Sequence, residues 1–371
     1  MIWLAGAALL AWLYLALLHG RFWQSGPVLA AARPAAAPAV AVVVPARDEA
    51  ALVGPVLRSL LAQDYAGDLG VVLVDDGSGD GTGEVARALG DARLVVLEGA
   101  ARPPGWAGKL WAVQQGVAAT AAPWLLLTDA DIVHAPAHLA TLMAEAERSG
   151  ADMVSEMVAL NCSSAAERAL IPAFVYFFQL LYPFARVNRP ASRVAAAAGG
   201  TLLIRRAALE AIGGIAAIRG ALIDDVALAV AVKRQGRRIW LGHSALARSV
   251  RPYPSAGDIW RMVARSAYVQ LRHSLLLLVA TTLGLGLIYL VPPLAALAGQ
   301  GAARRCGLLA WAVMAATLLP TLRRFCLSPL RAPLLPLVAV FYMAATIGAA
   351  IDHHRGRGVV WKRRAYTEFQ A

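Results

Sequence analysis

Four long apolar runs constrain the fold of this chain most, because a helix of about 20 apolar residues spans the hydrocarbon core of a bilayer. The first run covers residues 1–19 and holds no acid, lysine or arginine. Three more lie toward the other end of the chain, at about 274–298, 306–322 and 332–351. The 59% share of hydrophobic residues and the mean hydropathy of +0.58 also favour a membrane protein over a soluble one.

The charge balance and the cysteines exclude several classes of function. The formal net charge is +12, yet only 16% of the 371 residues are charged. In so apolar a chain, arginines that flank membrane spans explain the excess better than a nucleic-acid site does, and no zinc-finger spacing is present. The cysteines Cys162, Cys306 and Cys326 are odd in number and scattered, which argues against a disulfide framework and a CxxC metal site.

The apolar runs suggest a chain of five parts. Residues 1–22 are expected to form an uncleaved transmembrane anchor, because a cleaved signal peptide normally opens with positive charge and the first arginine, Arg21, follows the run. By the positive-inside tendency, the N-terminus lies outside. The other parts are an Ala/Pro linker at 23–39, an α/β domain at 40–273, about three transmembrane segments at 274–352 and a basic cytoplasmic tail at 353–371.

The number of spans stays open. Three clean spans after a cytoplasmic domain would put the tail outside, whereas its basic charge predicts the cytoplasmic side. One of the segments is then re-entrant or interfacial. The first is a candidate, because Pro292 and Pro293 interrupt it.

The middle of the chain alternates apolar strands with helical stretches. Strands are predicted at 40–46, 69–77, 92–99 and 122–131, and stretches such as EAALVGPVLRSLLAQ and DGTGEVARALG between them are predicted to be helical. This alternation is typical of a largely parallel sheet that is covered on both faces. Ligands of such sheets bind at the carboxyl ends of the strands.

Acidic residues follow three of these strands. PARDEA supplies Asp48 and Glu49, VDDGSGDGT supplies Asp76, and LLLTDAD supplies Asp129 and Asp131. Because side chains alternate along a strand, Asp129 and Asp131 are expected on one side, where they repel each other unless a cation lies between them. Each acid alone could instead cap the following helix. Together, the acids fit a shared ligand with ribose hydroxyls and a metal-bound diphosphate.

Six motifs follow one another in the order VVVPARDE, VVLVDDGSGDGT, GWAGKLWAVQQG, LLLTDAD, GGTLLIRRAAL and IDDVALA. In this order and rough spacing, over about residues 38–275, the chain resembles family-2 glycosyltransferases. With its N-terminal anchor and C-terminal spans it resembles the hopene-associated branch of that family. The resemblance implies an α/β, Rossmann-like GT-A domain with a mostly parallel sheet, an N-terminal transmembrane helix and a C-terminal helical membrane region.

The resemblance implies nucleotide-sugar contacts at the matching positions. Pro45, Asp48 and Glu49 lie where the family binds the nucleoside, although Asp48 replaces the usual asparagine. Asp76 is expected to face the uracil or the ribose. Lys109, in GWAGKLWA, would contact the donor diphosphate, and the alternative is a solvated lysine at the start of a helix.

The resemblance also implies a metal site and a general base. Asp131, with Asp129, matches the DxD pair that holds Mg²⁺ or Mn²⁺ at the donor diphosphate. Asp225 matches the base that takes the proton of the acceptor hydroxyl in a single inverting displacement. Asp224 stands in place of the family's glutamate. The alternative is that Asp224 and Asp225 only cap the helix that follows.

The last family motif, QxxRW, is degraded in SAGDIWRMVARSAYVQLRHS. No tryptophan follows Arg265 or Arg272. Arg265 is the expected donor contact, because it follows Trp260 and Arg261 at helical spacing. The alternative is a basic juxtamembrane helix that touches lipid phosphates. The loss of the strict motif argues against a processive polymer synthase.

A further apolar run, at 169–187, is expected to form an interfacial helix that dips into the cytoplasmic leaflet. A single crossing there would put Asp131 and Asp225 on opposite sides of the membrane, and Pro172 and Pro183 interrupt the run. A plain core helix is the alternative.

The basic tail holds the last candidate residues. Trp361, Lys362 and Arg364 are expected to return to the site or to bind headgroups. His353 and His354 are interpreted as interface residues rather than metal ligands, because the sequence shows no third ligand nearby.

These features predict a multi-pass protein of the inner (cytoplasmic) membrane with a cytoplasmic catalytic domain. It would be a metal-dependent, inverting hexosyltransferase that moves a sugar from a nucleotide-sugar, expected to be a UDP-sugar, to a lipid hydroxyl. The branch resemblance suggests a hopanoid or another isoprenoid lipid as the acceptor. Two other classes remain open. One is a non-catalytic membrane scaffold or lipid-handling protein, and the other is a nucleotidyltransferase, although PARDEA lacks the glycine-rich loop of that class.

Overall fold

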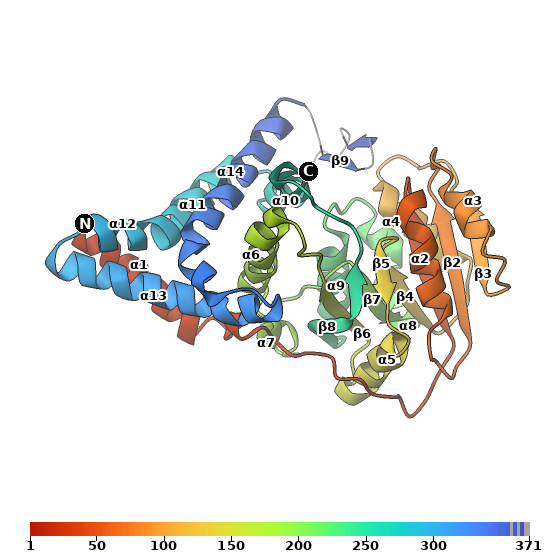
Figure 1. Ribbon diagram of the computed structural model, residues 1–371. Coiled ribbons are helices and arrows are strands. Elements are labelled where there is room, and N and C mark those ends of the chain that lie inside the picture. Colours follow the sequence, from red (N-terminus) through yellow and green to blue (C-terminus); the bar gives the residue numbers. More distant parts are fainter. Residues whose placement is uncertain (357–358, 362–363, 367–371) are drawn as a thin grey trace.

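The computed structural model describes residues 1–356, 359–361 and 364–366, and it divides into a sheet domain and a helical region (Figure 1). In the view of Figure 1, the sheet domain lies on the right. On the left lie α1 (Ile2–Leu17), α12 (Val291–Ala298) and α13 (Gly301–Arg324). Helices α6 (Ala165–Leu181) and α10 (Ala256–Gln270) lie between the two parts.

One eight-stranded sheet forms the core of the sheet domain. Its strands are β1 (Val40–Ala46), β2 (Leu69–Asp75), β3 (Leu94–Glu98), β4 (Trp124–Thr128), β5 (Ile132–His134), β6 (Met153–Ala159), β7 (Thr201–Arg205) and β8 (Ile239–Ser249). Their order across the sheet is β3-β2-β1-β4-β7-β6-β8-β5. Strands β1 to β4 are parallel, as are β6 and β8, whereas β7 and β5 pair antiparallel with their neighbours. The predicted Rossmann-like domain is confirmed, and β7 and β5 make its sheet mixed.

Helices cover both faces of the sheet, which explains why β1 is apolar throughout. Its valines 40, 42 and 44 lie in one apolar cluster with residues of α2 (Ala50–Leu61), α3 (Thr82–Arg87) and α5 (His138–Ser149). Ala41 and Val43 lie in another cluster with residues of α4 (Gly108–Ala118), α8 (Arg206–Ala211) and α9 (Asp224–Arg234). A strand that is buried on both faces has no polar alternation, as the sequence of β1 predicts.

The helical region contains most of the long apolar helices. Helix α11 (Leu275–Leu285) continues through a π-helical turn, η3 (Gly286–Leu290), into α12, and α14 (Leu335–His354) follows the 3₁₀ segment η4 (Pro329–Leu334). In the described part of the chain, four segments are long and apolar enough to cross a membrane: Ala165–Val187, Leu275–Ala298, Gly301–Arg324 and Pro329–His354. The last three lie where C-terminal spans are predicted.

Helix α1, inside the predicted anchor at 1–22, has 16 residues and is shorter than these four segments. It packs along α13. The Trp12 indole N–H donates to the Ile288 carbonyl at 2.6 Å, and the Trp12 ring contacts Tyr289 edge-on at 5.4 Å. The first helix is therefore joined to the C-terminal helices.

The segment Ala165–Val187 does not separate the two halves of the sheet. It consists of α6 and α7 (Phe184–Val187), and in the chain it lies between β6 and β7, which are hydrogen-bonded neighbours in one sheet. Both ends of the segment therefore lie on the same side of any membrane, and a single crossing is excluded. Tyr176 of α6 is buried and its hydroxyl lies 2.8 Å from Thr317 Oγ1 of α13, as in a core helix. The interfacial location stays a prediction.

Three histidines gather between the end of α10 and the end of α14. His273 stacks on His353 with ring centroids 4.2 Å apart, and His354 Nε2 lies 3.1 Å from the Tyr268 hydroxyl. Folding thus brings His273, which lies 80 residues earlier in the chain, to the end of α14 beside His353. Within residues whose side chains are described, no group of three or more His, Cys, Asp or Glu residues could hold a metal ion.

The tail continues into β9 (Val359–Trp361) and β10 (Arg364–Tyr366), which form an antiparallel pair. The predicted roles of Trp361, Lys362 and Arg364 concern side chains that lie outside the described residues.

Candidate active site

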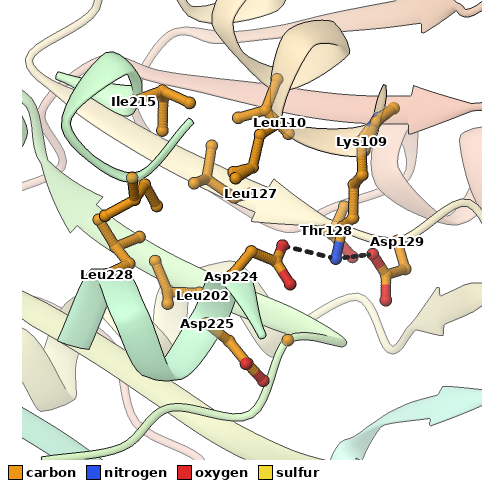
Figure 2. A pocket seen from close by; sticks show the side chains of 14 residues that line it. Lys109, Leu110, Leu127, Thr128, Asp129, Leu202, Ile215, Asp224, Asp225 and Leu228 are labelled. Atoms are coloured by element: carbon orange, nitrogen blue, oxygen red, sulfur yellow. Dashed lines mark ion pairs between the residues drawn. The ribbon is translucent and has the colours of Figure 1, made fainter. Parts of the chain in front are cut away.

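One lysine ammonium joins two acids from different elements. Lys109 lies in the first turn of α4, and its Nζ is 2.8 Å from Asp129 Oδ1 and 3.0 Å from Asp224 Oδ2 (Figure 2). Desolvation alone would lower the pKa of Lys109, but the two carboxylates outweigh it and raise that pKa above its usual value. Only 24% of the Lys109 side chain is exposed. The lysine is therefore an ion-paired residue of the site and not a solvated one.

A second cation, Arg251, lies between two more acids. Arg251 Nη2 donates to Glu49 Oε1 at 2.5 Å, and its Nε donates to Asp131 Oδ2 at 2.6 Å. The backbone holds this arginine close to the acids, because the Val250 amide donates to the Asp131 carbonyl at 2.8 Å. Most of each of the three side chains is buried. The arginine thus ties the loop after β8 to the ends of β1 and β4.

The predicted arrangement of Asp129 and Asp131 needs a correction. Strand β4 ends at Thr128, so the alternation of a strand does not apply to the two acids that follow it. Each acid meets a different side-chain cation, because Asp129 pairs with Lys109 and Asp131 pairs with Arg251. The two acids still interact. Burial raises the pKa of Asp129 to about 6, Lys109 opposes this rise, and the charge of Asp131 adds to it.

Asp225 is directed away from the lysine. Figure 2 shows Asp224 pointing toward Lys109 and Asp225 turned from it. Burial, followed by the charge of Asp224, raises the pKa of Asp225 to about 7. Its Oδ1 accepts from the Val226 amide at 2.8 Å. A Cβ at Gly199 would lie 3.1 Å from Asp225 Oδ2, so this glycine leaves room for the carboxylate. A carboxylate with a pKa near neutrality suits a general base.

The helix-cap alternative accounts for few of these acids. The N-cap of α9 is Ile223, and no side chain caps this helix. At the start of α2, the Glu49 side chain makes no cap either. The amides of Glu49 and Ala50 donate instead to Thr82 Oγ1 and Asp80 Oδ2, at 2.8 and 2.9 Å. The loop after β2 and the first residue of α3 therefore cap α2, and the Glu49 carboxylate is directed to Arg251.

Asp48 takes part in the same contact between loops. Its φ of 49° is left-handed, a conformation that aspartate tolerates better than most residues. Its amide donates to Ser78 Oγ and its Oδ1 accepts from the Gly79 amide, both at 3.0 Å. Asp76 is buried, and its Oδ2 lies 3.5 Å from Arg47 Nη1. These acids hold the two loops together.

An open cavity of about 1310 Å³ contains most of the predicted site residues. Those that line it are Pro45, Glu49, Lys109, Asp129, Asp131, Asp225 and Arg265, whereas Asp48 and Asp76 do not. Arg265 lines the cavity from α10, and its charge opposes the rise that burial causes in the pKa of Tyr253. Its neighbour Arg261 also lines the cavity and pairs with Asp258 at 2.6 Å.

The other wall of this cavity is apolar and aromatic. It is formed by α6, α10 and α14, with the side chains of Phe174, Phe177, Phe178, Trp260, Val263, Ala339 and Tyr342. Tyr182, just after α6, receives a hydrogen bond from Gln270 Nε2 of α10 at 2.6 Å, and both residues line the cavity. The same cavity thus contains the acidic ends of the strands and a surface suited to an apolar molecule.

Sequence reasoning missed Arg251. The residue lies in an irregular loop after β8, and its partners are 120 and 202 residues away in the chain. The available signal was the position of Arg251 just after the buried strand β8. Because β8 was not predicted from the sequence, this signal could not be used.

Comparisons with known proteins agree with this architecture. The family model described as "Glycosyltransferase like family 2" matches residues 37–268. A Staphylococcus aureus (strain bovine RF122 / ET3-1) protein named 4,4'-diaponeurosporenoate glycosyltransferase is 34% identical over 91 residues, which are 24% of this chain and 23% of that protein. Its counterpart from strain USA300 is 33% identical over 94 residues, 25% of this chain and 24% of that protein. The match thus spans about a quarter of the curated relatives.

A solved structure is similar over nearly the whole chain. It is a mannosyltransferase from Pyrobaculum calidifontis in complex with GDP-Man and Mn²⁺, with a TM-score of 0.57 and 21% sequence identity. The similarity covers 95% of this chain and 99% of that one, and at this identity it shows the fold. The family model covers more than half of the chain, with all six sequence motifs inside it. The chain therefore belongs to the family-2 glycosyltransferases, and its sheet domain has the GT-A fold.

Proposed function

We propose that the protein is a membrane-bound, inverting glycosyltransferase that moves a sugar from a nucleotide-sugar to the hydroxyl of a lipid. The cavity carries this proposal, because it joins the acids at the strand ends to an apolar wall of α6, α10 and α14. A polar donor and an apolar acceptor need such a pair of surfaces, with the reacting atoms where the two meet.

The donor side consists of residues from the end of β1, the start of α2, the first turn of α4 and helix α10. Lys109 and Arg265 are the proposed contacts of the donor diphosphate, and Pro45 and Glu49 lie toward the nucleoside. Asp48 and Asp76 act there indirectly, through the loops that they hold. A UDP-sugar is the expected donor. The similar mannosyltransferase was solved with GDP-Man, so GDP-sugars belong in any test.

The chemistry of the donor side fits a divalent cation. Asp131 and Asp129 are mostly buried carboxylates that line the cavity, and burial has raised the pKa of Asp129 to about 6, a sign of unfavourable negative charge. We propose that these two acids hold Mg²⁺ or Mn²⁺ together with the donor diphosphate. When bound, the metal would supply neutralisation of the charge on the leaving nucleoside diphosphate.

Asp225 is the proposed general base. Its carboxylate lies in the cavity wall beside Gly199, on the turn that also carries Asp224. It would accept the proton of the acceptor hydroxyl as that oxygen attacks the anomeric carbon of the donor, and the bond from that carbon to the diphosphate breaks. One displacement inverts the configuration at the anomeric carbon.

The acceptor is proposed to be a lipid, either a hopanoid or another isoprenoid. The aromatic wall supports an apolar acceptor, and so do the segments long enough to cross a membrane. The name of the S. aureus relatives, diaponeurosporenoate glycosyltransferase, agrees with an isoprenoid type of acceptor, although their match covers only a quarter of each protein.

We propose that the catalytic domain faces the cytoplasm from the inner membrane. The positive-inside tendency supports this orientation at Arg21, which follows α1. It does not orient α13, because Arg304 and Arg305 lie near the start of this helix and Arg323 and Arg324 at its end.

The first test is nucleoside diphosphate release by the purified protein in lipid. It uses a panel of UDP- and GDP-sugars with Mn²⁺, Mg²⁺ or EDTA, and a bacterial lipid extract as the acceptor. Metal-dependent release from one donor, lost in Asp225→Asn, is the expected result and would name the sugar. Absence of release from every donor would instead favour a scaffold or lipid-handling protein.

A further inference from the structure

Arg251 forms ion pairs with the two acids that a metal-bound donor would approach. It donates to Asp131 and to Glu49 at 2.6 and 2.5 Å, and these carboxylates come from the ends of two different strands. Its planar guanidinium can hold two carboxylates at once, which the compact ammonium of a lysine does less well. Asp131 and Glu49 therefore share the single positive charge of Arg251, which leaves one formal negative charge between them.

Lys109 does the same for the neighbouring acids, Asp129 and Asp224. In these two groups, four carboxylates face two cations, which leaves two formal negative charges. A divalent cation would neutralise that remainder. However, it would have to approach Asp131 against the positive charge of Arg251, which is bonded to the same carboxylate. The local geometry thus opposes a metal that arrives alone.

A donor diphosphate changes this balance. Its oxygens are strong acceptors for a guanidinium, so Arg251 can exchange a carboxylate for a phosphate without leaving its charge unpaired. The diphosphate also supplies oxygen ligands for the metal, which Asp131 alone supplies poorly. The arginine lines the same cavity as the proposed donor contacts, so its guanidinium faces the space in which the diphosphate would bind.

We propose that Arg251 makes metal binding conditional on the donor: the nucleotide-free enzyme holds Mn²⁺ or Mg²⁺ weakly, and the nucleoside diphosphate draws the arginine from Asp131 and Glu49 as the metal enters. The inference rests on the proposed donor site. It adds to that site an order of binding and a residue, Arg251, that sets this order.

The test measures binding of Mn²⁺ itself, by the loss of the electron paramagnetic resonance signal of free Mn²⁺. The full-length protein in nanodiscs is titrated with Mn²⁺ alone and with UDP or GDP present. Wild-type protein is expected to bind Mn²⁺ at least about tenfold more tightly when its nucleotide is present. In Arg251→Met, Mn²⁺ alone is expected to bind about tenfold more tightly than it does to wild type, and the gain from nucleotide shrinks.

Two further variants keep the result interpretable. Arg251→Lys retains the charge but holds two carboxylates less well, so a smaller increase of metal-alone affinity is expected, and it serves if Arg251→Met does not fold. Arg33→Met, which removes an exposed arginine paired with Asp64, should bind Mn²⁺ as wild type does.

The outcomes separate this inference from the proposed function. Nucleotide-dependent Mn²⁺ binding in wild type, with unchanged metal-alone affinity in Arg251→Met and Arg251→Lys, would overturn the role of Arg251 alone. Equal affinity of wild type for Mn²⁺ with and without nucleotide would overturn it as well. No binding of Mn²⁺ with any nucleotide would overturn the proposed donor site and this inference together.

Discussion

Lys109 Nζ lies 3.0 Å from Asp224 Oδ2, and this ion pair connects the first turn of α4 to the first turn of α9. The same ammonium bonds Asp129 at the end of β4. The lysine therefore fixes the positions of Asp129 and Asp224, and its removal should affect stability as well as donor binding.

Replacing Lys109 by methionine should destabilise the protein more at high pH. Without the ammonium, Asp129 and Asp224 remain partly buried and like-charged, so the pKa of Asp129, already about 6, rises further. When the pKa of an acid is higher in the folded protein than in the unfolded chain, the folded protein loses stability as the pH rises above the pKa of the unfolded chain. We expect the free energy of unfolding to fall by about 1–3 kcal/mol at pH 8, which lies between the typical effects of removing an exposed and a buried ion pair. At pH 6 the fall should be smaller.

Thermal unfolding of Lys109→Met at pH 6 and pH 8 measures this effect. Arg33→Met is the control, because its pair with Asp64 is exposed. Equal stability of the two variants at pH 8 would show that Lys109 does not neutralise its partners.

Asp225→Asn should abolish transfer without abolishing donor binding. The amide keeps the shape of the side chain but cannot accept the proton of the acceptor hydroxyl, and the loss of a general base costs roughly 10²–10⁴-fold in kcat. The affinity for the nucleoside diphosphate should stay within about threefold of wild type, because the Asp225 carboxylate is turned away from Lys109 (Figure 2). Asp64→Asn, an exposed counterpart, should retain full activity. A variant Asp225→Asn with wild-type kcat would remove this residue from the mechanism.

The pH dependence of kcat should follow the ionisation of Asp225. Because burial raises its pKa to about 7, the carboxylate is protonated, and unable to act as a base, below that pH. The rate at saturating substrate should therefore fall about tenfold for each pH unit below about 6.5 and level off above about 7.5. Steady-state rates from pH 5.5 to 9 test this. A profile that is flat down to pH 5.5 would contradict the assignment.

Narrowing the cavity at its apolar wall should weaken binding of the lipid acceptor and leave binding of the donor unchanged. Thr346 of α14 lines the cavity, so Thr346→Phe should raise KM for a lipid acceptor severalfold while the affinity for the donor is unchanged. Val340→Phe, on an exposed part of the same helix, is the matched control. If both variants have the same KM, the acceptor lies elsewhere.

Both ends of Ala165–Val187 should be accessible from one side of the membrane. In a chain whose native cysteines are replaced by serine, Ser163→Cys and Arg189→Cys should react with a membrane-impermeant maleimide from the same side. Strands β6 and β7 pair in one sheet, which requires this result. Labelling from opposite sides would mean that the sheet is not formed in the membrane-bound protein.

The sequence predicted the local elements well and the pairing of charges poorly. Strand β1 spans the predicted 40–46, because a run that is apolar on both faces has few other options. Asp129 and Asp131 were predicted together, and their cavity is shared. Which cation each acid meets depends on Lys109 and Arg251, and long-range contacts of this kind leave no periodic pattern. The contact of His273 with His353 could not be predicted from the sequence for the same reason.

The position of β7 in the sheet has a consequence for synthesis of the protein. Strand β4 pairs with β1 on one side and with β7 on the other, and β7 emerges from the ribosome only after the apolar segment Ala165–Val187. Until then the edge of β4 is open, and Asp131 lacks its ion-pair partner Arg251, which is synthesised later still. The nascent chain therefore carries a half-built sheet beside apolar helices, a state prone to wrong pairing. Slow translation or chaperone binding across residues 160–250 would protect it.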